Sequence, residues 1–205
     1  MTALLRHPEF RVLRLLLRRN SVLKKLPREA WDALEPLLDI TDLRKGASLE
    51  YQGDRAMEQY FILDGILKRV VSSPEGREMI LRFAAEDDID TSYAAWRLKT
   101  PLPYTIRAVT RVRVARLRME DWVDFMERHP AVKAPFEFEV MRLMSEVMAH
   151  TITLHLLDAA GRVARFVRKQ KALASRLPKK ELALYLNLTP ETLSRLKRRG
   201  KIALD

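Results

Sequence analysis

LTPETLSRLKRRG, residues 188–200, combines a helix start signal with a dense run of positive charge. Thr189 can cap free backbone N–H groups, Pro190 suits the first helical position, and Glu191 suits the positive end of the helix dipole. We therefore expect a helix over residues 190–199. Its first half carries side chains that can bond base edges and its second half carries charges suited to phosphates, a sorting that a merely solvated helix does not require.

A second short helix is expected immediately before this one. Pro178 suits the first turn of a helix over residues 178–186, and residues 187–189 then form a short connection. Two short helices joined in this way match a helix-turn-helix, although short helical hairpins also occur in proteins that do not bind DNA. The expected core residues are Ala183, small where the helices would cross, Asn187, which tolerates a left-handed backbone, and Leu193.

The polar residues of this module divide into two groups by the DNA atoms that they suit. For contacts with base edges we expect Glu191, Thr192, Ser194 and Arg195. For contacts with DNA phosphates we expect Lys179, Thr189, Lys197, Arg198 and Arg199.

Positive charge is concentrated in the same part of the chain. The net charge is +11, and residues 158–205 hold 13 Lys and Arg against 4 Asp and Glu, which leaves 25 against 23 for residues 1–157. Such asymmetry suggests a polyanionic partner, either nucleic acid or an anionic membrane surface, whereas solvated charge alone is the simpler alternative.

The composition excludes several classes of protein. Apolar residues make up 47% of the 205 residues, enough for a folded core, and no apolar run reaches the ~20 residues of a membrane span. Cysteine is absent, which removes disulfides, thiolate zinc sites, cysteine-bound iron–sulfur clusters and cysteine nucleophiles. By exclusion, we expect a cytoplasmic protein with no membrane partner. No catalytic pair of carboxylates, phosphate loop or serine elbow is visible, so we do not expect an enzyme. The acidic run 86–88 with Asp90 could hold a divalent cation, but a solvated turn is the favoured interpretation.

Between residues 43 and 117 the apolar pattern has a period of two. Short segments rich in β-branched and aromatic residues alternate with turns that contain glycine, which favours an antiparallel sandwich or barrel. Residues 1–39 instead indicate helices, with Leu13, Leu16 and Leu17 on one face. The expected strands include residues 48–51, 60–63, 66–71 and 79–83.

A long helix is expected over residues 134–157, because no Gly or Pro follows Pro135 within it. Apolar residues recur at steps of four and three, the spacing of a coiled-coil seam, which favours a dimer over the packing of a single helix. The expected seam residues are Val140, Met144, Val147, Thr151 and Leu154. With a hinge at residues 158–161, the expected domains are 1–128 (N-terminal helices and barrel), 129–157 (dimerisation helix) and 158–205 (helix-turn-helix).

The glycine turns of the barrel, the hinge segment 157–164 and the segment 188–196 together resemble the Crp–Fnr family of bacterial transcription regulators. The resemblance covers nearly the whole chain. It implies an α+β fold with an antiparallel β-barrel of jelly-roll type as the sensor domain, a long dimerisation helix and a C-terminal helix-turn-helix domain with a wing. It also implies a homodimer that binds double-stranded DNA, with RNA polymerase as a further candidate partner. By this resemblance Glu191 and Arg195 read a C·G pair and Ser194 lies near a thymine, so the palindromic half-site resembles TTGA.

The expected effector site departs from the family's nucleotide-binding pattern. Nucleotide binders carry a Gly-Glu pair for the ribose and an Arg followed by Ser or Thr for the cyclic phosphate, where this chain has Thr91-Ser92 and Leu102-Pro103. The ribose would lose its carboxylate acceptor and the phosphate its cation, so cyclic AMP is not expected to bind. An iron–sulfur cluster is not expected without cysteine. Haem stays open because the chain has four histidines, although lone helical histidines usually pack or face solvent.

The wing is the second departure. Family members normally continue past the second helix into a β-hairpin, whereas residues 201–205 suffice for half a strand, so phosphate contacts from a wing are not expected. The leading hypothesis is a DNA-binding regulator with a degenerate effector site. The alternative is a ligand-responsive or protein-interaction module that has lost sequence-specific DNA reading.

Overall fold

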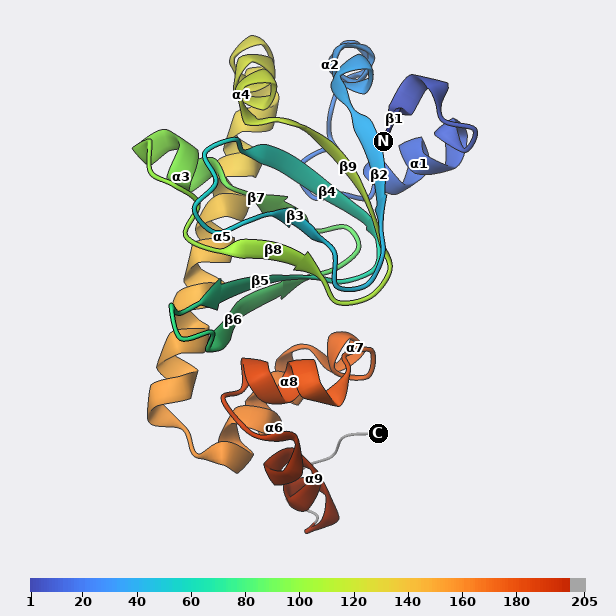
Figure 1. Cartoon of the computed structure of the whole chain (residues 1–205). Helices are drawn as coiled ribbons and strands as arrows, with labels where there is room; N and C mark the ends of the chain where they lie inside the picture. Colours follow the sequence, from blue (N-terminus) through green and yellow to red (C-terminus); the bar gives the residue numbers. More distant parts are fainter. Residues whose placement is uncertain (200–205) are drawn as a thin grey trace. The chain divides into compact units, whose positions relative to one another are not determined.

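The computed structural model describes residues 1–199 (Figure 1), and the expected half strand at residues 201–205 lies outside the described residues. The chain divides into two compact units. The first comprises residues 1–69 and 83–144, and the second comprises residues 70–82 and the chain from residue 145 onward. This division falls inside the long helix rather than at its ends.

The first unit begins with a short strand, where we expected only helices. Thr2 pairs with Ile40, and the Leu4 N–H donates to the Leu38 carbonyl at 2.8 Å. Leu4 is fully buried, so its burial together with these backbone bonds outweighs any local helical tendency. The elements that follow one another here are β1 (Thr2–Ala3), η1 (Leu4–Arg6), α1 (Phe10–Leu17), α2 (Arg28–Leu34) and η2 (Glu35–Leu37).

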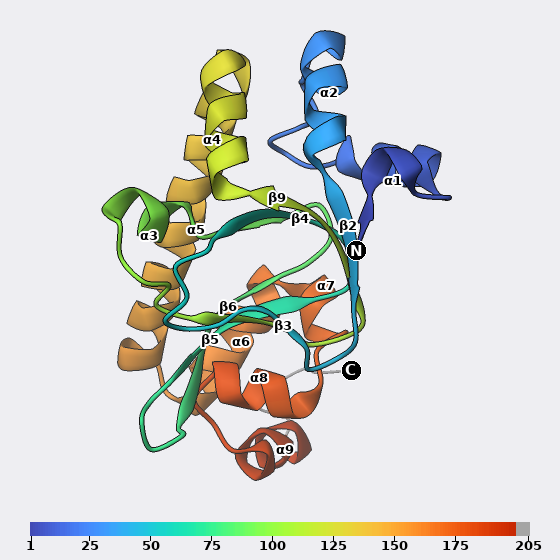
Figure 2. The same cartoon turned by 45° about the horizontal axis from the view of Figure 1, so that its top comes forward.

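The described strands form two sheets (Figure 2). The larger sheet adds β2 (Asp39–Leu43), β4 (Glu58–Asp64), β7 (Ile89–Thr91) and β9 (Val112–Arg118) to β1, in the order β1-β2-β9-β4-β7. The smaller sheet contains β3 (Ser48–Glu50), β5 (Leu67–Ser72), β6 (Glu78–Ala84) and β8 (Thr105–Ala108), in the order β3-β8-β5-β6. The strand pairs are antiparallel, which confirms the expected antiparallel barrel and the α+β class.

Strand β9 shows how the alternating pattern is used. Val112 and Val114 are fully buried, while Arg113 lies on the opposite face. The Arg113 guanidinium donates to Asp42 at 2.8 Å and to Glu9 at 2.6 Å. Its charge is therefore neutralised by neighbouring elements, which makes this face a solvated sheet surface.

The long helix α5 (Pro130–Leu156) starts earlier than the expected residue 134, since Pro130 suits a first helical turn. Fully buried Phe136 anchors its first half. The Phe136 ring packs edge-on against Trp122 of α4 (Met119–Arg128) at 5.3 Å and against Tyr93 of α3 (Tyr93–Leu98) at 5.1 Å. Across residues 1–199, no helix combines the length and apolar character that a membrane crossing requires.

The second unit contains α6 (Ala159–Lys169), α7 (Lys171–Ala174), α8 (Lys179–Tyr185) and α9 (Pro190–Arg198). The break between α5 and α6 lies at residues 157 and 158, so it meets the expected hinge at residues 158–161 only at Asp158, and α6 begins at Ala159. Asp158 caps that helix by accepting from the Gly161 N–H at 2.8 Å. A Cβ on Gly161 would lie 3.0 Å from the Asp158 carboxylate, so the glycine makes room for the cap rather than for a bend.

His150 is a packing residue of the second unit. Its imidazole stacks on the Tyr185 ring of α8 with centroids 3.7 Å apart and planes within 3° of parallel. Burial lowers the pKa of His150 to about 4, so the ring is neutral at pH 7. The buried histidine thus joins the second half of α5 to the first helix of the helix-turn-helix.

Candidate nucleic-acid interface

The connection between α8 and α9 has the geometry that a helix-turn-helix requires. Asn187 has a φ of 51°, in the left-handed region that asparagine tolerates. The Leu188 N–H donates to the carbonyl of Ala183 at 2.9 Å and closes the turn. Ala183 is completely buried and Leu193 is 2% exposed, so both lie in the small core beneath the two helices.

Arg162 of α6 holds this turn from the other side. Its guanidinium donates to the carbonyl oxygens of Leu186, at 2.8 Å, and Asn187, at 3.3 Å. These carbonyls lie at the end of α8, where no helical N–H is available to them. Sequence reasoning missed this role, because a residue 24 positions away from its partner leaves no local pattern.

We expect Arg162→Ala to destabilise the second unit by about 1–3 kcal/mol, because the two carbonyls lose their donor. Urea unfolding followed by circular dichroism measures the change. Arg168→Ala, which removes an exposed arginine of the same helix, is the matched control. Equal free energies of unfolding for the two variants would show that the turn does not depend on Arg162.

Helix α9 is capped as its sequence predicts. The Thr189 hydroxyl accepts from the Thr192 N–H at 3.2 Å, and Pro190 occupies the first turn. The backbone N–H of Glu191 and the Thr189 side chain hold the pKa of the Glu191 carboxyl below its usual value. Glu191 is therefore an ionised acceptor at pH 7.

The exposed face of α9 brings the expected base-reading residues together. Glu191, Ser194 and Arg195 are exposed and follow one another at helical spacing, while Leu193 faces the core. Thr192 is half-buried beside its cap. The expected phosphate residues Lys179, Thr189, Lys197, Arg198 and Arg199 are exposed as well. Carboxylate, hydroxyl and guanidinium groups thus share one face, which suits hydrogen bonding to base edges.

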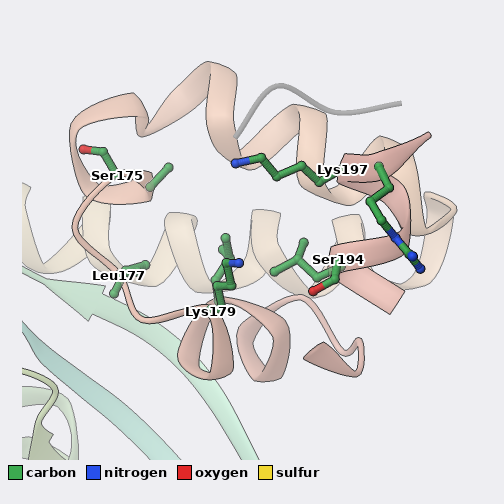
Figure 3. A pocket seen from close by; sticks show the side chains of 9 residues that line it. Ser175, Leu177, Lys179, Ser194 and Lys197 are labelled. Atoms are coloured by element: carbon green, nitrogen blue, oxygen red, sulfur yellow. The ribbon is translucent and has the colours of Figure 1, made fainter. Parts of the chain in front are cut away.

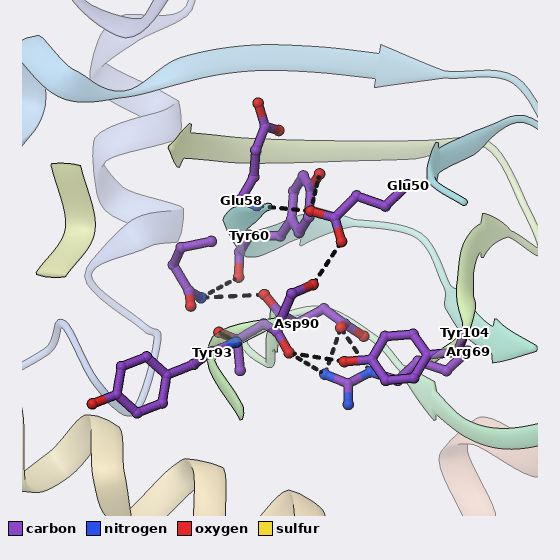
Figure 4. A network of polar contacts seen from close by, with 10 residues as sticks. Glu50, Glu58, Tyr60, Arg69, Asp90, Tyr93 and Tyr104 are labelled. Carbon is purple, nitrogen blue, oxygen red and sulfur yellow. Dashed lines mark hydrogen bonds and ion pairs between the residues drawn. The ribbon is translucent and has the colours of Figure 1, made fainter. Parts of the chain in front are cut away.

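In the barrel, two of the four residues of the expected effector site, Thr91 and Ser92, belong to a buried polar network (Figure 4). The Ser92 hydroxyl donates to Glu50 at 2.6 Å, and the Glu58 N–H and the Tyr60 hydroxyl donate to the other Glu50 oxygen at 2.7 and 3.2 Å. Ser92 and Glu50 are 1% and 4% exposed. Burial raises the pKa of Glu50 to about 7.

The second part of this network surrounds the guanidinium of Arg69. Arg69 donates to the Asp90 carboxylate and to the Thr91 carbonyl, both at 2.8 Å. Its guanidinium lies 4.4 Å from the centre of the Tyr104 ring. Arg69 and Thr91 border a cavity of about 220 Å³, whose other lining residues, Pro103 and Leu143 among them, are mostly apolar. Leu102 is buried.

Comparison with known proteins finds one matching domain family and several similar regulators. The cyclic nucleotide-binding domain family matches residues 40–129. The nitrogen fixation regulation protein FixK of Bradyrhizobium diazoefficiens is 24% identical over 92% of this chain and 84% of its own length. The cAMP-activated global transcriptional regulator CRP of Salmonella typhimurium is 23% identical over 58% of this chain and 57% of its own length. The structure of FixK2 from Bradyrhizobium japonicum has a TM-score of 0.69 at 18% identity, over 80% of this chain and 86% of that chain.

Residues 40–129 thus match a cyclic nucleotide-binding domain, and the chain shares the fold of the FixK2 structure. Within this fold, the charged side chains at the expected effector site already have partners inside the protein. The Arg69 guanidinium is already bound by Asp90, and the Glu50 carboxylate is bound by Ser92. A nucleotide phosphate would find no uncommitted cation among the described residues that line the cavity.

The acidic run at residues 86–88 is a structural turn. Asp87 adopts a φ of 68° and pairs with Arg19 at 2.8 Å, and Asp88 pairs with Arg142 at 3.3 Å. Glu86 accepts from the Gly65 N–H at 2.8 Å. Within residues 1–199, no cluster of His, Asp and Glu has the geometry of a metal site.

We expect Glu50→Gln to flatten the pH dependence of stability. Because the folded pKa of Glu50 is raised to about 7, the protonated form is favoured by folding, and this contribution to stability is lost as pH rises from about 4.5 through 7. The measurement is urea unfolding of both proteins at about pH 5 and about pH 8. Glu29→Gln, at an exposed carboxyl of α2, is the control. An unchanged pH slope in Glu50→Gln would contradict this assignment.

Proposed function

We propose that this chain is a homodimeric, sequence-specific DNA-binding transcription regulator whose helix α9 reads a palindromic, TTGA-like site. The observation that carries the proposal is the exposed face of α9, where Glu191, Ser194 and Arg195 stand together over a buried leucine. Arginine can donate twice to guanine and a carboxylate can accept from cytosine, so Arg195 and Glu191 suit one C·G pair. FixK and CRP, the similar proteins, carry the names of regulators, which favours regulation over catalysis.

Dimerisation is supported by an exposed apolar stripe along α5. Each side chain of this stripe is more than half exposed, which is unusual for a protein that works as a monomer. Its residues are Phe138, Met141, Met144, Met148, Ile152 and Leu156. Met144 also belongs to the seam expected from the sequence, whereas Val140, Val147 and Leu154 are half-buried against the chain itself. In a dimer joined along this stripe, the two α9 helices would enter successive major grooves about 34 Å apart.

The Arg69 and Glu50 side chains already form hydrogen bonds with Asp90 and Ser92, which supports a regulator that does not bind cyclic AMP. A nucleotide would have to break two buried polar pairs before its phosphate and ribose found partners, and each broken pair leaves a buried group unsatisfied. Isothermal titration with cyclic AMP tests this part of the proposal. Saturable binding at micromolar concentrations would contradict it.

Fluorescence anisotropy with two duplexes tests the proposal as a whole. The chain should bind a TTGA palindrome about a thousandfold or more tighter than a shuffled duplex at physiological salt. If the chain bound the palindrome and the shuffled duplex with equal affinity at each of two salt concentrations, the alternative would be favoured. The chain would then be a ligand-responsive or protein-interaction module whose basic surface binds polyanions without sequence preference.

Arg199→Ala should weaken binding to the palindrome and to the shuffled duplex by the same factor, because we expect Arg199 to contact a phosphate rather than a base. The logarithm of the association constant should also depend less steeply on salt, by about one unit of slope. Titrations of both duplexes between about 50 and 200 mM salt measure these quantities. A selective loss on the palindrome alone would assign Arg199 to a base instead.

A further inference from the structure

The helix-turn-helix unit contains a cavity of its own. Helices α7, α8 and α9 surround a space of about 540 Å³ (Figure 3). Leu177, Leu182 and Leu193 supply an apolar side and are each at most 7% exposed. Lys179 from α8 and Lys197 from α9 extend toward this space, as Figure 3 shows. The cavity therefore offers a hydrocarbon-like wall and cationic groups at its opening.

The charge around this cavity is unbalanced. Its described lining residues include Lys179, Lys197 and Arg198 and no acidic side chain. None of these three cations forms an ion pair of 4 Å or less with another residue in the described part of the chain. The hydroxyl groups of Ser175 and Ser194 add hydrogen-bonding capacity. An occupant that satisfies this surface carries a negative charge at one end.

We propose that this cavity binds an amphiphilic monocarboxylate, a medium-chain fatty acid, with its carboxylate between Lys179 and Lys197 and its chain against the leucines. Inorganic phosphate would satisfy the cations but leave the apolar wall unfilled. A fatty alcohol would contact the apolar side chains but would leave the cations without a negatively charged partner. A single molecule with both parts fits the chemistry of the site, since apolar sites with a few convergent polar groups are the usual form of small-molecule sites.

The position of this cavity couples it to DNA. Ser194, Lys197 and Arg198 line it and also lie on the helix that we propose to read DNA. A bound carboxylate would neutralise charge that DNA phosphates need, so ligand and DNA compete. This consequence rests on the proposed function, whereas binding of the ligand does not.

Isothermal titration of the full chain with decanoate, below its micellar concentration, tests the site. We expect one molecule bound per chain, with decanol and butyrate each binding at least about tenfold more weakly. Lys179→Ala and Lys197→Ala should each weaken decanoate binding about fivefold or more. Lys180→Ala, which removes the adjacent exposed lysine of α8 that does not line the cavity, should leave it unchanged. Ala174→Phe should weaken binding strongly by occupying part of the cavity while every cation is retained.

Several results would overturn the proposal. These are the absence of saturable binding, equal binding by parent and Ala174→Phe, or binding that appears only after residues 200–205 are removed. Competition is measured separately, as a decanoate-dependent loss of affinity for the TTGA palindrome that Ala174→Phe does not show. If decanoate binds but does not change the affinity of the chain for the palindrome, only the proposed competition between ligand and DNA is refuted. If the chain binds decanoate but does not bind DNA, the ligand site is supported and the proposed function is refuted.

Discussion

Arg195→Ala should weaken binding to the TTGA palindrome by about 1–3 kcal/mol per half-site, roughly 5- to 150-fold, and should relax the preference for the base pair that Arg195 contacts. Arg195 is exposed on α9, whereas the core of the helix rests on Leu193. Alanine favours a helix, so the fold should be unaffected. The loss should therefore come from the removed contact with a base.

Anisotropy titrations of the palindrome and of a shuffled duplex measure the effect as a ratio of affinities. Arg168→Ala removes another exposed arginine, from α6, and serves as the charge-matched control, because it should lower both affinities slightly and leave their ratio unchanged. If Arg195→Ala kept the parent's ratio, base reading by α9 would be refuted.

A second large effect is expected from charge on the apolar stripe of α5. Met148 and Ile152 are 64% and 51% exposed and lie one turn apart. Replacing both with glutamate places like charges opposite each other in a seam, so the dimer should dissociate. Without a linked second recognition helix, affinity for the palindrome should fall by about 10²-fold or more, while affinity for a single half-site stays unchanged.

Light scattering coupled to size-exclusion chromatography gives the mass of the particle, and circular dichroism checks that the monomer is folded. Met148→Leu keeps an apolar side chain at the same position and should remain dimeric. A dimer that persists in the double glutamate variant would show that the stripe is not the interface.

The helix-turn-helix could be predicted from sequence because its signals are local. A threonine cap, a proline in the first turn and an asparagine in a short connection act within a few residues of one another, and each has the predicted geometry. The barrel was predictable as a class, since alternating apolar residues and glycine turns are also local.

The polar network of the barrel could not be predicted in the same way. Glu50 and Ser92 are separated by 42 positions and Arg69 and Asp90 by 21, so their pairing depends on which strands become neighbours. The sequence showed that Thr91-Ser92 and Leu102-Pro103 stand where a nucleotide-binding pattern would be, but not that internal partners satisfy the site. The extent of the hinge between α5 and α6 could not be predicted from the sequence either. Asp158 and Gly161 are compatible with either a bend or a helix cap, and the tertiary fold selects the cap.

The most direct test of the central claim is selection of binding sites from a fully randomised duplex library by the purified full chain. The account predicts enrichment of two inverted TTGA-like half-sites with centres one helical turn apart, about 34 Å, and loss of that enrichment in Arg195→Ala. Retention of DNA on the chain without any enriched sequence would contradict it.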